Sequence, residues 1–192
     1  MNRTKRKIFE TSMNLFATKG YDATSIEEIT SVVGVAKGTL YYHFSSKEEI
    51  FNFLVEEGMK LLQNSISIKI ANCNTLADKL RAVLLIQIKV MIKYEDFMTI
   101  VLSQVLGKES RNLTCRKYVF DYIDMIEKII QDSIDKGETK AINNLDNPKI
   151  LASGLFGITY SILLHKIKNG DTSIPELYKE YEKIIFSKYN LE

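Results

Sequence analysis

The sequence has few of the residues that build disulfides or metal sites. Among 192 residues it contains two cysteines, Cys73 and Cys115, and two histidines, His43 and His165. Each stands alone in its segment, and no CxxC pair or Cys/His cluster occurs. Disulfide-stapled scaffolds and structural zinc centres both depend on such clusters. The sequence therefore predicts no metal site and no cofactor, and we expect both cysteines to be buried thiols.

Long apolar runs are also absent. The basic start MNRTKRK is typical of the opening of a signal peptide, but Glu10, Thr11, Ser12 and Asn14 interrupt the apolar segment that should follow. The most apolar later run, residues 154–164, contains polar side chains and is far shorter than the ~20 residues of a membrane span. We expect a cytoplasmic protein without a membrane partner.

The common catalytic motifs are missing as well. The sequence has no GxSxG elbow, no GxxxxGK[ST] phosphate loop and no HExxH zinc motif. We therefore predict that the protein has no catalytic residues and is not an enzyme.

Charge is nearly balanced over the chain but unevenly placed. The formal net charge is +2, whereas residues 1–47 hold seven Lys/Arg against four Asp/Glu. A basic bias of this size is compatible with contacts to phosphate groups, and it is also typical of a solvated surface.

Two prolines and nine glycines leave long stretches without a helix breaker. Apolar residues recur at three-to-four spacing throughout, and sustained alternation of the strand type is absent, which predicts an all-α protein. The expected helices cover about 3–19, 26–33, 36–44, 46–70, 76–94, 96–106, 118–136, 148–169 and 174–189, with a loop at 138–146. Neither an internal repeat nor a low-complexity segment interrupts this pattern.

Two short helices joined at Gly34 predict a helix-turn-helix. Thr24 and Ser25 each precede a glutamate by three residues, the capping-box signature of a helix start. Leu40 and Phe44 are four residues apart, so they fall on one face and should pack in the core beside Ile26 and Ile29. The opposite flank of that helix would then be exposed.

The stretch YDATSIEEITSVVGVAKGTLYYHFSSKEEIF, with its Gly-Val turn and its Lys-Gly-Thr-Leu-Tyr and His-Phe runs, resembles the DNA-binding region of TetR-family transcriptional regulators. The resemblance implies a three-helix DNA-binding domain at residues 1–47 and a helical ligand-binding and dimerisation domain at 48–192, with about nine helices in all. It also implies a homodimer that places each third helix in the major groove of double-stranded DNA.

Residues expected to face DNA lie on the third helix and at two helix starts. Lys37 would reach a guanine or a phosphate, and Gly38 would allow close approach of the helix to the groove. The full set is Thr24, Ser25, Lys37, Gly38, Thr39, Tyr41, Tyr42, His43 and Lys47. Two departures from the family pattern stand out: Ala36 replaces the usual Ser/Thr helix cap, and Glu27 lies near the expected DNA backbone.

The C-terminal part predicts a dimer interface and an effector pocket. Small residues between 152 and 161, together with the apolar residues of the last helix, would form the interface, although packing within one subunit explains the same pattern. Flexible and aromatic residues would line the pocket, although at helical spacing such residues are also typical of a core. These pocket residues are Gln87, Met91, Tyr94, Met98, Tyr118, Tyr122, Met125 and Tyr160.

The function predicted from all these features is a ligand-responsive repressor. It would form a homodimer through its last two helices and bind a palindromic operator in that form. A small apolar or amphipathic effector would release it from the operator. The alternative is a helical small-molecule-binding or membrane-surface protein that does not bind an operator.

Overall fold

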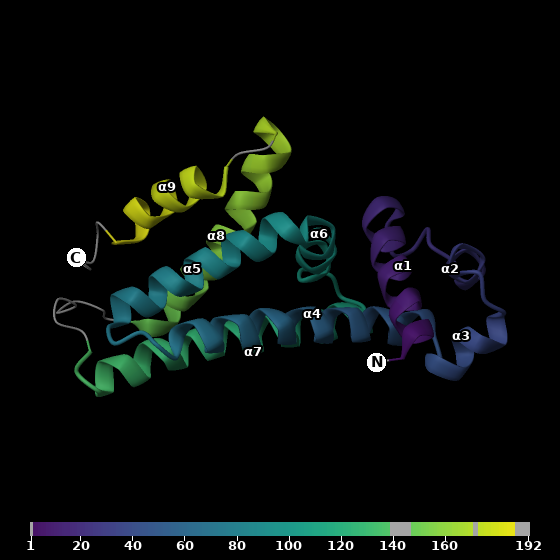
Figure 1. Ribbon diagram of the computed structural model, residues 1–192, viewed down its shortest axis with the longest axis horizontal. Coiled ribbons are helices and arrows are strands. Elements are labelled where there is room, and N and C mark those ends of the chain that lie inside the picture. The colour runs from purple at the N-terminus through teal and green to yellow at the C-terminus, as the bar shows by residue number, and fades with distance from the viewer. Residues whose placement is uncertain (1, 139–146, 171–172, 187–192) are drawn as a thin grey trace. The chain divides into compact units, whose positions relative to one another are not determined.

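The computed structural model describes residues 2–138, 147–170 and 173–186. The described residues are helical and contain no strand, which confirms the predicted all-α class. The nine helices of these ranges are α1 (Arg3–Lys19), α2 (Ile26–Val33), α3 (Lys37–His43), α4 (Lys47–Ile70), α5 (Leu76–Lys93), α6 (Glu95–Gln104), α7 (Ser110–Asp135), α8 (Pro148–Asn169) and α9 (Ile174–Phe186) (Figure 1).

The chain packs as two compact units. Unit 1 contains Met1–Met59 and Asp96–Tyr118, and unit 2 contains Lys60–Glu95 and Val119–Glu192. The long helices α4 and α7 each contribute residues to both units. The predicted functional division between residues 47 and 48 lies at the start of α4 and stays a prediction.

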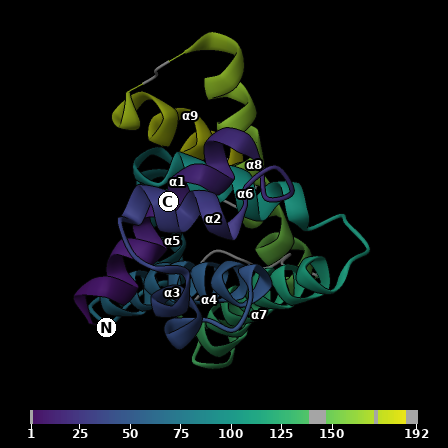
Figure 2. The same cartoon turned by 90° about the vertical axis from the view of Figure 1, so that its right-hand side faces the viewer.

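In unit 1, local signals set the ends of the first two helices. The side chain of Asn2 accepts a hydrogen bond from the Lys5 amide at the start of α1, and Ser25 accepts one from the Glu28 amide at the start of α2. Gly34 ends α2 in the left-handed region, with φ of 76°, a conformation that favours glycine. Figure 2 shows α1, α2 and α3 in a second view.

The core of unit 1 holds α3 by its apolar face. Leu40 and Phe44 are 0% and 1% exposed, as expected from their spacing. The ring of Phe44 packs against that of Phe53 on α4, with centroids 5.4 Å apart. Ile29 of α2 is also fully buried, and α2 packs against α3.

The later segment of unit 1 packs closely on α4. Gly58 faces the ring of Phe97 on α6, and a Cβ atom at position 58 would overlap that ring. Arg116 of α7 donates to the carbonyl oxygens of Val105 and Gly107, which satisfies acceptors at the end of α6. Arg111 pairs with Asp22 in the connection between α1 and α2.

Helix α7 begins eight residues earlier than predicted, at Ser110 rather than at 118. Its buried positions continue the helical spacing backwards through Cys115 and Asn112. Asn112 is polar, and its amide donates to the Gln104 carbonyl while its side-chain oxygen accepts from the Glu109 amide. A search for apolar periodicity therefore misses the first two turns of the helix.

Unit 2 packs α5 against α8 and α9. Arg81 of α5 donates to Glu182 of α9 at 2.9 Å, and its guanidinium lies over the ring of Phe186. Lys79 donates to Ser133 and Glu138 at the far end of α7. The helices predicted at 148–169 and from 174 match α8 and α9, while residues 187–189 and the loop residues 139–146 lie outside the described residues.

The expected burial holds for one of the two cysteines. Cys115 is buried, but Cys73 is only half-buried because it lies in the turn after α4. Among the helices in the described ranges, none combines the length and the apolar character that a bilayer crossing requires.

Candidate DNA interface

Helix α3 presents two opposite faces. The face that carries Leu40 is buried, whereas Tyr42 is 84% exposed and Tyr41 is 45% exposed. Lys37 and Gly38 are exposed, and Thr39 and His43 are half-buried. The expected DNA-facing residues of α3 therefore form one accessible surface, which we call the α3 flank: Lys37, Gly38, Thr39, Tyr41, Tyr42 and His43.

The amino end of the α3 flank carries an ion pair with α2. Lys37 Nζ donates to Glu27 Oε1 at 2.5 Å, and both side chains are exposed. This hydrogen bond raises the pKa of Lys37 and lowers the pKa of Glu27. The same amine lies 5.9 Å from the centre of the Tyr41 ring. A contact between Lys37 and DNA stays a prediction, and it would require Lys37 to exchange Glu27 for a DNA acceptor.

The carboxyl end of the α3 flank holds two aromatic rings at right angles. The Tyr42 and His43 ring centroids are 5.0 Å apart, with an interplanar angle of 73°. The contact limits the orientations of the exposed Tyr42 ring, and both side chains have polar atoms that are able to donate to phosphate oxygens.

The residues at the start of α2 have different roles. Ser25 is exposed and caps the helix, next to the free N–H groups that favour an anion. Thr24 is buried, and its hydroxyl donates to the carbonyl of Gly20 at 2.9 Å. A contact between Thr24 and DNA stays a prediction, and the side chain serves the domain interior in this structure.

Lys47 organises the connection between α1 and α2. Its Nζ donates to the carbonyl oxygens of Tyr21 and Thr24, both at 2.9 Å, and lies 4.3 Å from the centre of the Tyr21 ring. Arg111 lies over the same ring at 4.4 Å. These roles were not foreseen, because carbonyl partners more than 20 residues away leave no signal in the sequence. A phosphate contact of Lys47 stays a prediction.

Helix α3 also begins without a side-chain cap, since Ala36 stands at the cap position. This was expected from the sequence. Caps of Ser or Thr contribute about 1 kcal/mol, so α3 depends on its buried face for stability.

Gly38 provides a prediction with opposite effects on stability and binding. A Cβ atom built at position 38 meets nothing within 4 Å, so the fold does not require glycine there. Gly38→Ala should raise the free energy of unfolding by about 0.5–1 kcal/mol, because alanine favours the helix. It should weaken operator binding about tenfold, because the added methyl overpacks the surface against DNA.

Thermal denaturation and fluorescence anisotropy with operator DNA would measure the two effects of Gly38→Ala. A stabilised variant with unchanged affinity would show that the Cα of Gly38 does not lie against the duplex.

The predicted pocket residues divide between the two units. Met98 and Tyr118 belong to unit 1, and the other six belong to unit 2. In unit 2, Gln87, Met91 and Tyr122 are buried, Tyr94 and Met125 are half-buried, and Tyr160 is 50% exposed. Their assignment to an effector site stays a prediction.

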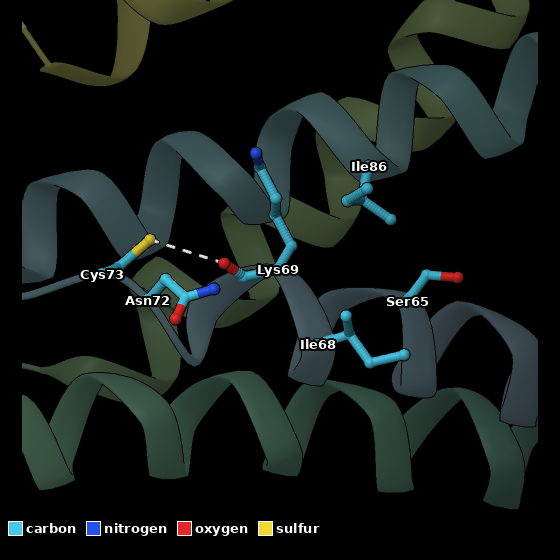
Figure 3. A pocket seen from close by; sticks show the side chains of 6 residues that line it. All are labelled: Ser65, Ile68, Lys69, Asn72, Cys73 and Ile86. Carbon is cyan, nitrogen blue, oxygen red and sulfur yellow. Dashed lines mark hydrogen bonds between the residues drawn. The ribbon is translucent and has the colours of Figure 1, made fainter.

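Unit 2 also has an open groove of about 540 Å³ between the end of α4 and α5 (Figure 3). It is lined by Ser65, Ile68, Lys69, Asn72, Cys73 and Ile86. None of the eight predicted pocket residues lines this groove. Within the described ranges, no group of three or more His, Cys, Asp or Glu side chains is arranged to hold a metal ion.

Helix α8 has a buried apolar face and an exposed face of small and apolar residues. Leu151, Leu155 and Ile162 are buried within unit 2. The second face consists of exposed residues that recur at helical spacing, and we call it the outer face of α8. Its residues are Ile150, Ser153, Gly154, Gly157, Tyr160, Ser161 and Leu164. Ser161 shares a hydrogen bond of 2.9 Å with Tyr181, which links this face to α9.

The anchored α3 and its exposed flank define a helix-turn-helix DNA-binding protein. Residues 8–54 match the family profile described as bacterial regulatory proteins, tetR family. A solved structure of a Clostridium perfringens putative fatty acid metabolism regulator is 33% identical, covers 94% of this chain and 97% of its own, and superposes with a TM-score of 0.86. The chain belongs to the TetR family of transcriptional regulators, which are regulators and not enzymes.

Two further proteins extend the comparison. An uncharacterized regulator of Bacillus subtilis, YerO, is 28% identical over 91% of this chain, which spans 60% of the length of that relative. The regulator AibR, crystallised with isovaleryl coenzyme A and operator DNA, shares the fold at 19% identity, with a TM-score of 0.76 over 96% of this chain and 98% of its own.

Proposed function

We propose that the protein is a repressor that binds a palindromic operator as a homodimer and is released by an acyl-coenzyme A. The observation that carries the DNA-binding part is the α3 flank, which is exposed while Leu40 and Phe44 hold the opposite face in the core. Half-sites one helical turn apart, about 34 Å, require two coupled recognition helices, so binding depends on dimerisation.

The outer face of α8 supports the homodimer. A contiguous patch of exposed apolar side chains marks an interaction surface, whereas single exposed apolar residues are normal. Ile150 and Leu164 are 68% and 49% exposed, and Ile184 of α9 is 67% exposed. Gly154 and Gly157 lie between them with open space around each Cα, which would let the same helix of a second copy approach closely. A two-fold dimer buries such a self-complementary patch on both copies.

Two relatives support the effector class. AibR was crystallised with an acyl-coenzyme A, and the Clostridium perfringens protein is described as a putative fatty acid metabolism regulator. An acyl-coenzyme A combines an apolar tail with a polar head, which matches the amphipathic effector expected from the sequence. To release DNA, it must bind the DNA-free arrangement more tightly by several kcal/mol than the DNA-bound arrangement.

The test is fluorescence anisotropy with DNA from the region upstream of the protein's own gene. We expect tight binding that weakens steeply as salt concentration rises, because contacts to phosphate release counterions. Lys37→Ala and Tyr42→Ala should each weaken binding about tenfold, since each removes a charge-assisted or hydrogen-bonded contact. Lys128→Ala, which removes an exposed lysine from α7 in unit 2, is the matched control and should bind as the wild type.

The effector part uses the same complex. Butyryl-, octanoyl-, dodecanoyl- and palmitoyl-coenzyme A are titrated into it, with free coenzyme A as control. We expect at least one acyl-coenzyme A, and not free coenzyme A, to release the DNA. Release by none of the four would refute the effector class and leave DNA binding standing, whereas equal binding by the wild type and both α3 variants would refute the interface.

A further inference from the structure

Two polar side chains are buried in unit 2 without a hydrogen-bond partner. Gln87 on α5 is 2% exposed, and Tyr122 on α7 is 0% exposed. Gln87 Oε1, Gln87 Nε2 and Tyr122 Oη make no hydrogen bond with the residues that the structure describes. Buried polar groups are normally paired, because water is lost without replacement, so three unpaired atoms in one place require an explanation.

These side chains are neighbours at a point where three helices meet. Burial raises the pKa of Tyr122 and keeps its phenol neutral, while the neighbouring Gln87 side chain lowers that pKa. The ring of Tyr122 also packs against Phe156 of α8, with centroids 6.0 Å apart. The polar ends of Gln87 and Tyr122 therefore lie together where α5, α7 and α8 pack.

The nearest neighbours of Gln87 and Tyr122 on their own helices are uncharged. All eight residues that lie three or four positions from Gln87 and Tyr122 along α5 and α7 are uncharged, among them Met91 and Ile126. A buried carboxylate would need a cation or several donors to offset its lost hydration. The pair is therefore suited to a neutral polar group.

We propose that Gln87 and Tyr122 recognise the thioester of the acyl-coenzyme A effector, an inference that rests on the proposed function. Gln87 Nε2 and Tyr122 Oη both donate to the thioester carbonyl oxygen, which accepts two hydrogen bonds. Gln87 Oε1 accepts from the first amide N–H of the pantetheine arm, which follows the sulfur closely. Met91 and Phe156 contact the adjoining methylene groups. The pair selects a thioester over the free fatty acid.

The test compares three forms of each ligand by isothermal titration calorimetry with the full-length protein. The forms are the acyl-coenzyme A thioesters of butyryl, octanoyl, dodecanoyl and palmitoyl chains, the matching alkyl thioethers of coenzyme A that lack the carbonyl, and the free fatty acids. For the chain length that binds most tightly, we expect the thioester to bind about 10- to 100-fold more tightly than the thioether. The free acid should bind more weakly than the thioester.

The variants are Tyr122→Phe and Gln87→Met, singly and together. Each keeps the shape of the side chain and removes polar atoms. The double variant should lose the preference for thioester over thioether and bind the thioether as the wild type does. Without ligand its melting temperature should rise by about 2–8 °C, because unpaired buried atoms are gone. A role in holding the fold alone would lower the melting temperature and leave the ligand preference intact.

Three results would overturn the proposal. They are equal loss of affinity for thioester and thioether in the double variant, an unchanged preference in that variant, and absence of binding by every thioester. In the first two cases the acyl-coenzyme A still releases DNA from the wild type, so the proposed function stands and only the recognition pair fails. In the third case the effector class fails too, while DNA binding is judged separately by anisotropy.

Discussion

Leu40→Ala should destabilise the protein by about 2–5 kcal/mol and remove operator binding at 37 °C. Leu40 is fully buried, so the substitution deletes apolar contacts and leaves a cavity where α3 meets the core of unit 1. Helix α3 has seven residues and no side-chain cap, so it has little stability of its own. Losing its anchor should detach the whole α3 flank. Urea denaturation and anisotropy at several temperatures would measure both effects.

A matched control for Leu40→Ala is Val32→Ala on the neighbouring helix α2. Val32 is 62% exposed, so its truncation should change the free energy of unfolding by no more than about 0.5 kcal/mol. If Leu40→Ala unfolded no more easily than this control, the inward anchoring of α3 would be refuted. If it were destabilised but bound DNA normally in the cold, the anchor would matter for folding only.

Gly157→Glu should convert the dimer to a monomer and weaken operator binding by about 100-fold or more, since two half-sites no longer bind together. A Cβ atom built at position 157 meets nothing within 4 Å, so the fold of the subunit should survive the substitution. In a dimer built on the outer face of α8, two copies of the new carboxylate would be buried close together, which is strongly unfavourable. Analytical ultracentrifugation would measure the mass, and anisotropy the affinity.

The control for Gly157→Glu is Asn64→Glu, which adds the same charge to an exposed position of α4 in unit 2. It should remain dimeric and bind DNA as the wild type. A dimeric Gly157→Glu with normal affinity would place the subunit interface elsewhere. Circular dichroism must show native helix content in both variants for the comparison to hold.

The sequence was most informative where a local signal determines a helix end. Helix α1 runs from Arg3 to Lys19 and α8 from Pro148 to Asn169, as predicted, because a glycine follows each and a proline opens α8. The burial of Leu40 and Phe44 followed from their spacing alone. These features depend on residues within a few positions of one another.

The sequence was least informative where contacts join distant residues. From the sequence, Lys47 was predicted to contact a phosphate. Its hydrogen bonds to two carbonyl groups of the α1–α2 connection were not predicted, because they depend on how α4 packs. The start of α7 was missed because Asn112 occupies a core position through hydrogen bonds rather than apolar contacts. Among the eight predicted pocket residues, Gln87 and Tyr122 have buried polar atoms without a hydrogen-bond partner. The sequence gives no sign of this, and the coordinates are needed to find it.

The bond between Lys37 and Glu27 has a consequence for how the protein searches a genome. A free surface lysine gains from any phosphate, because it displaces a condensed salt ion from DNA. Lys37 already holds a carboxylate as an internal counter-ion, so a random phosphate offers it little advantage over Glu27. Only at a site that also fits the rest of α3 would the additional contacts offset the loss of the bond between Lys37 and Glu27. If Lys37 contacts DNA as predicted, Glu27 would reduce the time spent on non-operator DNA and would also lower the absolute affinity.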